Sequence, residues 1–144
     1  MLLTPGGGAP PIFGSEYQDA VSAAVSTTTS TTFVQKLRLA TSALPAGRYR
    51  LEVSYQWNHD AINSNFEARV QQDDATELMH HVQEPSESGG TFGTTGTSQK
   101  YTFSKVMLLN LAAASYNFDL DFLTDNAGDP SSIWDATFTL WRVS

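Results

Sequence analysis

The run Arg48-Tyr49-Arg50-Leu51-Glu52-Val53-Ser54-Tyr55-Gln56-Trp57 decides the fold class, because apolar and polar side chains alternate over all of it. Successive side chains of a β-strand point to opposite faces, so this alternation predicts a strand with one apolar and one polar face. A helix would instead space its apolar residues three and four positions apart. The segment therefore predicts a sheet with one buried face.

Further strands are predicted on both sides of this run, in residues 33–40, 66–73, 76–83, 100–111, 115–123 and 133–143. In the first of them, Phe33, Gln35, Leu37 and Leu39 are expected to share the inner side. Turn-forming residues separate the segments, and no stretch has a convincing helical period. The chain is long enough for one core and too short for two ordinary domains. We expect a single all-β domain, a β-sandwich of jelly-roll type with about seven or eight antiparallel strands.

The first 32 residues differ in composition from the rest, with a glycine- and proline-rich start and the run Ser26-Thr-Thr-Thr-Ser-Thr-Thr32. Such a segment has little apolar surface to offset the entropy of ordering it. Residues 1–32 are therefore predicted to form an extended arm, and residues 33–144 the sandwich, which should fold without the arm. Ile12, Phe13 and Tyr17 are the candidate anchors on a partner. The alternatives are a flexible leader or a plain edge strand.

A weak internal similarity links two of the predicted strands. The segment that begins at Leu44 and leads through Tyr49 into the alternating run aligns with the segment that begins at Leu111 and leads through Tyr116. In each, a small-residue turn precedes an aromatic-led strand. The similarity predicts two equivalent central strands, although the same local physics acting twice would also produce it.

Composition excludes several classes of function. The formal net charge is −7 and no basic run occurs, so nucleic-acid binding is not expected. No apolar run approaches the roughly 18 residues of a membrane helix, and the N-terminus does not resemble a signal peptide. Without cysteine there are no disulfides and no thiolate metal ligands. We expect a complete small protein, made in the host cytoplasm, that contacts neither nucleic acid nor membrane.

Residues able to carry chemistry are few. Adjacent His80 and His81 should point to opposite faces of a strand, so they are not expected to share a metal, and His59 stands apart from them. A glycosidase pair made of Glu84 and Glu87 would lie in a flexible loop without a rigid frame. The motifs of α/β-hydrolases, P-loop proteins, dinucleotide-binding folds and zinc proteases are absent from the sequence. We expect no enzyme activity, no catalytic residues and no cofactor.

Aspartates are concentrated in the last third of the chain, where they allow two interpretations. Carboxylates at the end of a strand can bind calcium, but their spacing does not match an EF-hand. A solvated outer face with turn residues is the simpler interpretation, and no metal site is predicted. The residues concerned are Asp119, Asp121, Asp125, Asp129 and Asp135.

The last predicted strand carries apolar residues on both faces, including Trp134 and Trp141. A strand of this kind is either buried on both sides or part of a contact between subunits. Trp134 and Trp141 are therefore the candidate subunit contacts of a homo-oligomer, a dimer or a trimer. An aromatic platform that stacks on sugar rings is the alternative use of a displayed tryptophan.

Four segments together resemble small structural proteins of tailed-bacteriophage virions. They are residues 26–39, residues 44–57, the segment Phe66-Glu-Ala-Arg-Val-Gln-Gln-Asp-Asp74, and the ending Ala136-Thr-Phe-Thr-Leu-Trp-Arg-Val143. The resemblance covers most of the chain, and its motifs are structural.

The resemblance implies a jelly-roll-like cement or decoration protein of the capsid, located in the virion, without catalytic residues. Its partners would be the major capsid protein or other virion proteins. The alternative is a tail, collar or fibre component that acts as a carbohydrate- or receptor-binding sandwich.

Overall fold

Nine β-strands make up the regular structure of the residues that the computed structural model describes, 14–86 and 100–144. None of these residues forms a helix that could cross a membrane. The strands are β1 (Ser15–Ser22), β2 (Ser26–Thr28), β3 (Val34–Ala40), β4 (Gly47–His59), β5 (Phe66–Gln72), β6 (Thr76–Gln83), β7 (Tyr101–Leu111), β8 (Asn117–Thr124) and β9 (Ser131–Arg142).

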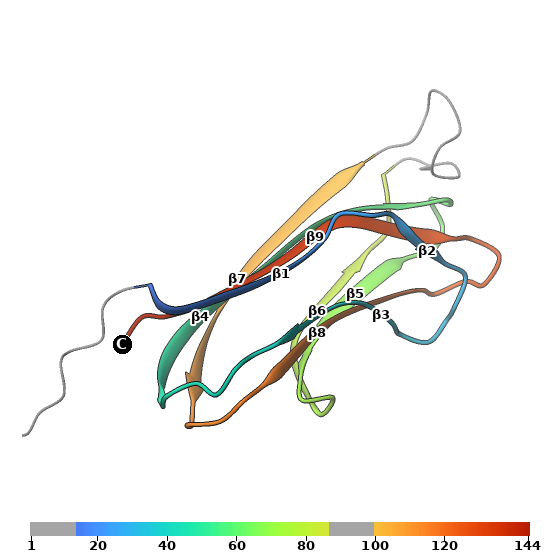
Figure 1. Cartoon of the computed structure of the whole chain (residues 1–144). Coiled ribbons are helices and arrows are strands. Elements are labelled where there is room, and N and C mark those ends of the chain that lie inside the picture. Colours follow the sequence, from blue (N-terminus) through green and yellow to red (C-terminus); the bar gives the residue numbers. More distant parts are fainter. Residues whose placement is uncertain (1–13, 87–99) are drawn as a thin grey trace, which may run out of the picture.

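The strands form two antiparallel sheets that pack face to face (Figure 1). Sheet A has the order β1-β9-β4-β7, with β2 pairing β9 beyond the end of β1, and sheet B has the order β3-β8-β5-β6. Strands β1 and β2 pair with β9, β3 pairs with β8, β4 with β7, and β5 with β6, so the pairing runs from the two ends of the chain inward. This is the pairing of one long antiparallel ribbon folded into two sheets. The predicted jelly-roll sandwich is confirmed.

The alternating run that predicted the fold class lies in the middle of sheet A as β4. The exposed fraction of its inward side chains, from Tyr49 through Trp57, is at most 1%. Across the core, sheet B presents Phe118, Leu120 and Phe122 of β8, all buried. Each such side chain contributes about 1.5–3 kcal/mol when it is removed from water, so this layer holds the two sheets together.

The internal similarity corresponds to one central strand in each sheet, since β4 lies between β9 and β7, and β8 lies between β3 and β5. It also repeats a hydrogen bond. Tyr49 Oη donates to the carbonyl oxygen of Pro45, and Tyr116 Oη donates to that of Ala112, each at 2.7 Å. Both tyrosines thus close the turn that leads into their strand by binding a carbonyl four residues upstream, as in a tyrosine corner.

The prediction that residues 1–32 lie outside the sandwich is wrong for the part that the structure describes. Strand β1 pairs with β9 from Ser15 to Ser22, and β2 continues along β9 from Ser26 to Thr28. The alternative of a plain edge strand holds instead. Deleting the first 32 residues would remove an integral part of sheet A, and the predicted anchors Ile12 and Phe13 lie outside the described residues.

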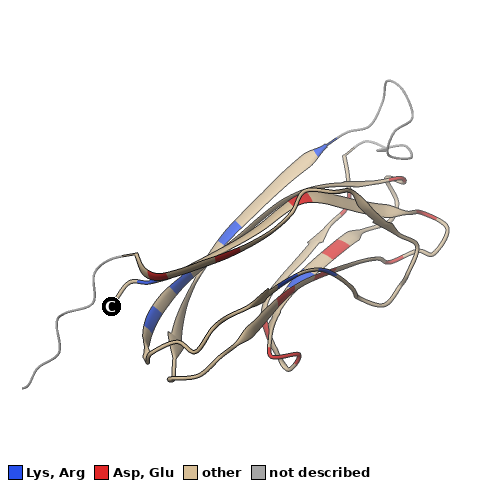
Figure 2. Ribbon diagram, in the orientation of Figure 1, with Lys and Arg blue, Asp and Glu red and all other residues tan. Residues whose placement is uncertain are grey.

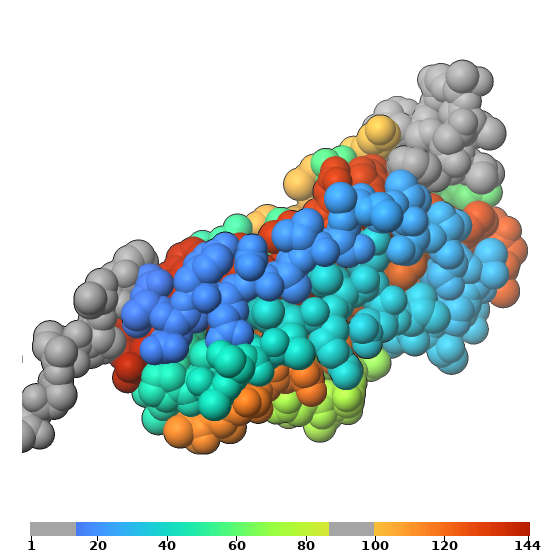
Figure 3. All heavy atoms as spheres, viewed as in Figure 1, coloured from blue at the N-terminus to red at the C-terminus, as the bar shows by residue number. Residues whose placement is uncertain are grey.

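Polar contacts explain how a segment with so little apolar surface becomes part of the fold. Gln18 of β1 exchanges two hydrogen bonds with Ser42, through its side-chain amide, and so joins the edges of the two sheets. The Lys36 ammonium of β3 donates to the Ala24 carbonyl and to the Ser26 hydroxyl. In Figure 3 the N-terminal strand (blue) lies directly against residues around β3 (cyan), in agreement with the contacts between β1 and β3. Backbone pairing and these side-chain bonds replace the missing apolar anchors.

The inner face of β3 also differs from its prediction, because the register of β3 against β8 shifts between Gln35 and Leu37. Leu37 and Leu39 face the core as expected. The irregularity sends Phe33 to the outside of sheet B, where the Arg69 guanidinium lies 4.1 Å from the centre of its ring. A β-bulge of this kind reverses which face the residues before it occupy.

Candidate binding surface

The outer face of sheet A carries a row of three large side chains on neighbouring strands. Tyr17 of β1 stacks on Trp141 of β9, with ring centroids 6.3 Å apart and an interplanar angle of 22°. Arg50 of β4, the register partner of Trp141, places its guanidinium carbon 4.5 Å from the centre of the indole ring. We call Tyr17, Trp141 and Arg50 the aromatic row. Tyrosine, tryptophan and arginine are the residue types most enriched at the energetic centres of protein interfaces.

Exposed apolar side chains surround the aromatic row. Leu108 of β7 is the register partner of Arg50 and is 54% exposed, and its neighbour Val106 is 42% exposed. On the β1 side, Tyr17 of the row is itself 56% exposed, and Val21 of the same strand is 62% exposed. Single exposed apolar residues are ordinary, but a group spread across one face indicates a contact surface.

Charge is distributed unevenly between the two sheets. The strands of sheet A carry equal numbers of cations and carboxylates: Arg48, Arg50, Lys105 and Arg142 against Glu16, Asp19, Glu52 and Asp135. Sheet B with its β5–β6 turn carries fewer cations than carboxylates: Lys36, Arg38 and Arg69 against Glu67, Asp73, Asp74, Glu77, Asp119 and Asp121. In Figure 2 the Lys and Arg positions of the upper layer lie mainly along β4 and β7. Sheet A is therefore the less acidic of the two sheets of an acidic protein.

The outer face of sheet B is an ion-pair network. Arg38 binds both carboxylate oxygens of Asp119 at 2.6 and 2.8 Å, and also Asp74 at 2.8 Å. Arg69 binds Asp121 at 3.1 Å. The prediction that Asp119 and Asp121 are solvated is wrong, because arginines of the flanking strands lie over them and leave them 1% and 7% exposed. Burial raises the pKa of Asp121, and the Arg69 guanidinium opposes that rise.

The histidines occupy the faces that the sequence predicts. His80 lies on the outside of β6, 2.9 Å from Glu67, and His81 faces the core. The Tyr55 hydroxyl, whose pKa is raised by burial, lies 2.7 Å from His81 Nδ1, and it donates there because the proton of the neutral ring is on Nε2. His81 Nε2 then donates to the Gln83 side-chain oxygen at 3.0 Å. Burial lowers the pKa of His81, which therefore acts as a neutral member of the core.

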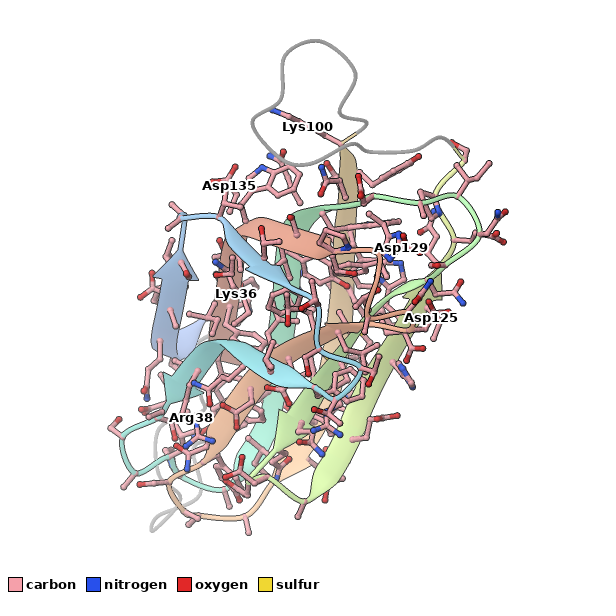
Figure 4. The ribbon with its side chains drawn as sticks, turned by 90° about the vertical axis from the view of Figure 1, so that its right-hand side faces the viewer. Lys36, Arg38, Lys100, Asp125, Asp129 and Asp135 are labelled. Carbon is pink, nitrogen blue, oxygen red and sulfur yellow. The ribbon has the colours of Figure 1, made fainter. Side chains whose placement is uncertain are left out.

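Nothing in the described part of the chain forms a group of three or more acidic, histidine or cysteine side chains that could hold a metal ion. The calcium alternative required free carboxylates after β8. Asp125 instead accepts hydrogen bonds from the backbone and side-chain amides of Asn65. Asp129 accepts from the Ser64 hydroxyl and from the Asn126 side chain. Both aspartates, labelled in Figure 4, thus hold the connection between β4 and β5 in place, and their role there is structural.

The structure brings together residues that the sequence assigned to two separate roles. Tyr17, predicted as an arm anchor, and Trp141, predicted as a subunit contact, belong to the same surface because β1 pairs with β9. Trp134 does not join them. It is 6% exposed, and its indole nitrogen donates to the Gln56 side-chain oxygen at 3.1 Å.

Sequence reasoning missed Arg50 and the exposed pair Val106 and Leu108. Arg50 was only one of several outward polar residues in the alternating run. The run Val106-Met-Leu-Leu109 is apolar on both faces, which is the signal that could have indicated a displayed patch on β7.

No protein-family model matches the chain, and no curated protein matches it in sequence. Among solved structures, the Eiger TNF of S. frugiperda matches 90% of this chain and 94% of its own, with a TM-score of 0.56 and 10% identity. A chain of the infectious bursal disease virus Gt strain matches 99% of this chain and 36% of its own, with a TM-score of 0.49 and 10% identity. TmCBM61, solved with β-1,4-galactotriose, matches 90% of each chain at a TM-score of 0.41 and 17% identity. The likeness to Eiger TNF extends to the sandwich fold alone.

Proposed function

We propose that this chain is a non-enzymatic structural protein of a bacteriophage particle, a cement or decoration protein that binds the assembled capsid shell through the outer face of sheet A. The aromatic row is the observation that carries this proposal. The resemblance of four segments to phage virion proteins supports the type of particle. The jelly-roll fold that the resemblance implied supports it further.

The physical basis is a group of large side chains on the outer face of sheet A, with exposed apolar residues around them. Tyr17 and Trp141 offer large rigid rings, and Arg50 offers a charge that pairs with Glu52 of the same strand at 2.7 Å. Leu108 and Val106 extend the apolar area around them. A protein that binds only the assembled lattice stabilises it by mass action, and moderate contacts suffice when they repeat over many copies.

A carbohydrate site on the same surface is less well supported. Strand β9 lies between β1 and β4, so the Trp141 ring stands between Tyr17 on one side and Arg50 on the other. Sugar rings bind tryptophan by stacking on a free ring face. Here both neighbours compete for that position, which favours a protein partner such as the major capsid protein.

The homo-oligomer stays a prediction, and of its two predicted contact residues only Trp141 lies on the surface. Trp134 is buried within the subunit and is not available for a contact. Trp141 is partly exposed and would contribute only if the subunits met through the outer face of sheet A, in competition with the shell. Light scattering at micromolar concentration distinguishes a monomer from the predicted dimer or trimer.

The test uses phage particles stripped of this protein and re-incubated with purified variants. Trp141→Ala and Leu108→Asp should each lower the affinity for the shell about 30-fold or more, as expected of residues at an interface centre. Val82→Asp is the matched control for Leu108→Asp, because Val82 is 51% exposed on the outer side of sheet B. Thermal melts establish that each variant is folded. Unchanged occupancy with both sheet A variants would disprove this mode of attachment.

A further inference from the structure

Four strands of seven residues or more lie at sheet edges in the described part of the fold: β1 and β7 in sheet A, and β3 and β6 in sheet B. Strand β2 also lies at the edge beside β9, but it has only three residues. Three of the four have an irregular register against their neighbour. The shift in β1 lies between Ser15 and Gln18, and the shift in β3 lies between Gln35 and Leu37. The shift in β6 lies between Glu77 and Met79, which pair with the adjacent residues Gln71 and Val70 of β5. Irregularities of this kind twist an edge and hinder the addition of another strand.

Strand β7 is the exception. It pairs with β4 over eleven consecutive positions, from Leu111 opposite Gly47 to Tyr101 opposite Trp57, without a register shift. No described strand pairs with its other side. Since only alternate residues of an edge strand point their backbone groups toward the neighbour, β7 presents a regular row of donors and acceptors outward. It is therefore the edge on which an added strand would meet the least distortion.

The side chains of β7 indicate what kind of strand would fit. Val106 and Leu108 are exposed on the outer face, next to the aromatic row. Lys105 lies on the other face, opposite Val53 in the register, and is exposed. Lys105 is the one charged residue of β7, and its ammonium has no ion-pair partner among the described residues. A lysine on an edge strand discourages unselective pairing, and it favours a strand that supplies a carboxylate.

We propose that β7 accepts an extended segment of another protein by strand addition, with a carboxylate opposite Lys105 and apolar side chains opposite Val106 and Leu108. The added segment would continue sheet A past β7 and enlarge the apolar surface of its outer face. The inference rests on the proposed function only in that a partner protein donates the strand. Backbone hydrogen bonds supply the affinity in this mode of recognition, and alternate side chains supply the specificity.

A second copy of the chain fits this edge less well. Strand β7 contains no carboxylate, and an antiparallel β7–β7 pair centred on Val106 would bring the two Lys105 side chains to diagonal positions on one face. The segment at residues 1–13 also contains no carboxylate, and its Pro5, Pro10 and Pro11 cannot donate to a ladder. The partner is therefore a different protein with an acidic extended segment.

The experiment uses the full chain and synthetic peptides. The probe is an end-capped eleven-residue peptide with Val at odd positions, Glu at position 6 and Thr at the other even positions, so that the valines and the Glu lie on opposite faces. The control peptide has Lys in place of Glu. Hydrogen exchange, read residue by residue, should show the Glu peptide protecting alternate amides between Tyr101 and Leu111. The Glu peptide should bind about fivefold more tightly than the Lys peptide, as expected for one cross-strand charge pair.

Lys105→Glu provides the decisive control, because the substitution is on an exposed side chain and should leave the fold intact. It should reverse the preference, so that the Lys peptide binds more tightly than the Glu peptide, and Lys105→Gln should abolish the preference. Equal binding of both peptides by the unaltered chain, protection at β1, β3 or β6, absence of protection at millimolar peptide, or self-association through β7 would each overturn the proposal. Because no particle is involved, this result is independent of whether Trp141→Ala and Leu108→Asp lose shell binding.

Discussion

The two tyrosine corners offer a test of the structure in which one bond is altered in two different environments. Tyr49→Phe and Tyr116→Phe each remove a single hydroxyl group and its 2.7 Å hydrogen bond to a carbonyl four residues upstream. Tyr49 is completely buried, whereas Tyr116 is partly exposed. The chemical change is identical, so any difference in the effect on stability reports the environment.

The magnitudes follow from what replaces each bond. A buried tyrosine hydroxyl bonded to a carbonyl contributes about 1 kcal/mol net, and part of that is recovered where water reaches the carbonyl. We therefore expect Tyr49→Phe to lower the free energy of unfolding by about 1–1.5 kcal/mol, and Tyr116→Phe by about 0.5 kcal/mol or less. For a chain of this length, about 3 °C of Tm corresponds to 1 kcal/mol, so the expected losses are about 3–5 °C and at most about 2 °C.

Urea denaturation followed by tryptophan fluorescence measures both free energies, and scanning calorimetry measures Tm. Unchanged dependence of the free energy on urea concentration would show that the variants unfold as the unaltered chain does. If Tyr116→Phe cost as much as Tyr49→Phe, the buried corner would not be the stronger of the two. The reasoning that burial strengthens the Tyr49 hydrogen bond relative to that of Tyr116 would then be wrong.

Three further predictions concern folding and pH. Burial lowers the pKa of His81, so below about pH 6.5 the unfolded chain takes up a proton that the folded chain does not. The free energy of unfolding should therefore fall by up to about 1.4 kcal/mol for each pH unit. His81→Gln should flatten this dependence in pH-resolved urea titrations and His80→Gln should not; equal slopes for the two variants would contradict it. Removing residues 1–28 should abolish the cooperative melt, because β9 loses its neighbours β1 and β2, which cover Phe138 and the rest of that edge. Removing residues 1–13 alone should preserve the melt. A stable product of the longer deletion would show that β1 and β2 are dispensable. Val53→Asp should unfold the domain, because it places an unpaired charge at a position with 0% exposure, and a normal melt would refute that placement.

The sequence alone determined the fold class and the location of the core. Strands β4, β5 and β6 were predicted within one residue or two of their bounds, since alternation is a local property that each strand carries in itself. The opposite faces of His80 and His81 followed for the same reason. The candidate binding surface was predicted only in fragments, as Tyr17 and Trp141 in two unrelated roles.

The tertiary structure alone decided how segments far apart in the sequence are joined. Strands β1 and β2 belong to the sandwich because their backbone groups pair with β9, which lies more than a hundred residues later in the chain. The local sequence of β1 and β2 does not indicate this pairing. Asp119 is buried because Arg38 of the neighbouring strand neutralises it. Tyr17 and Trp141 form one surface for the same physical reason: cross-strand pairing brings together side chains whose separation along the chain gives no indication of contact.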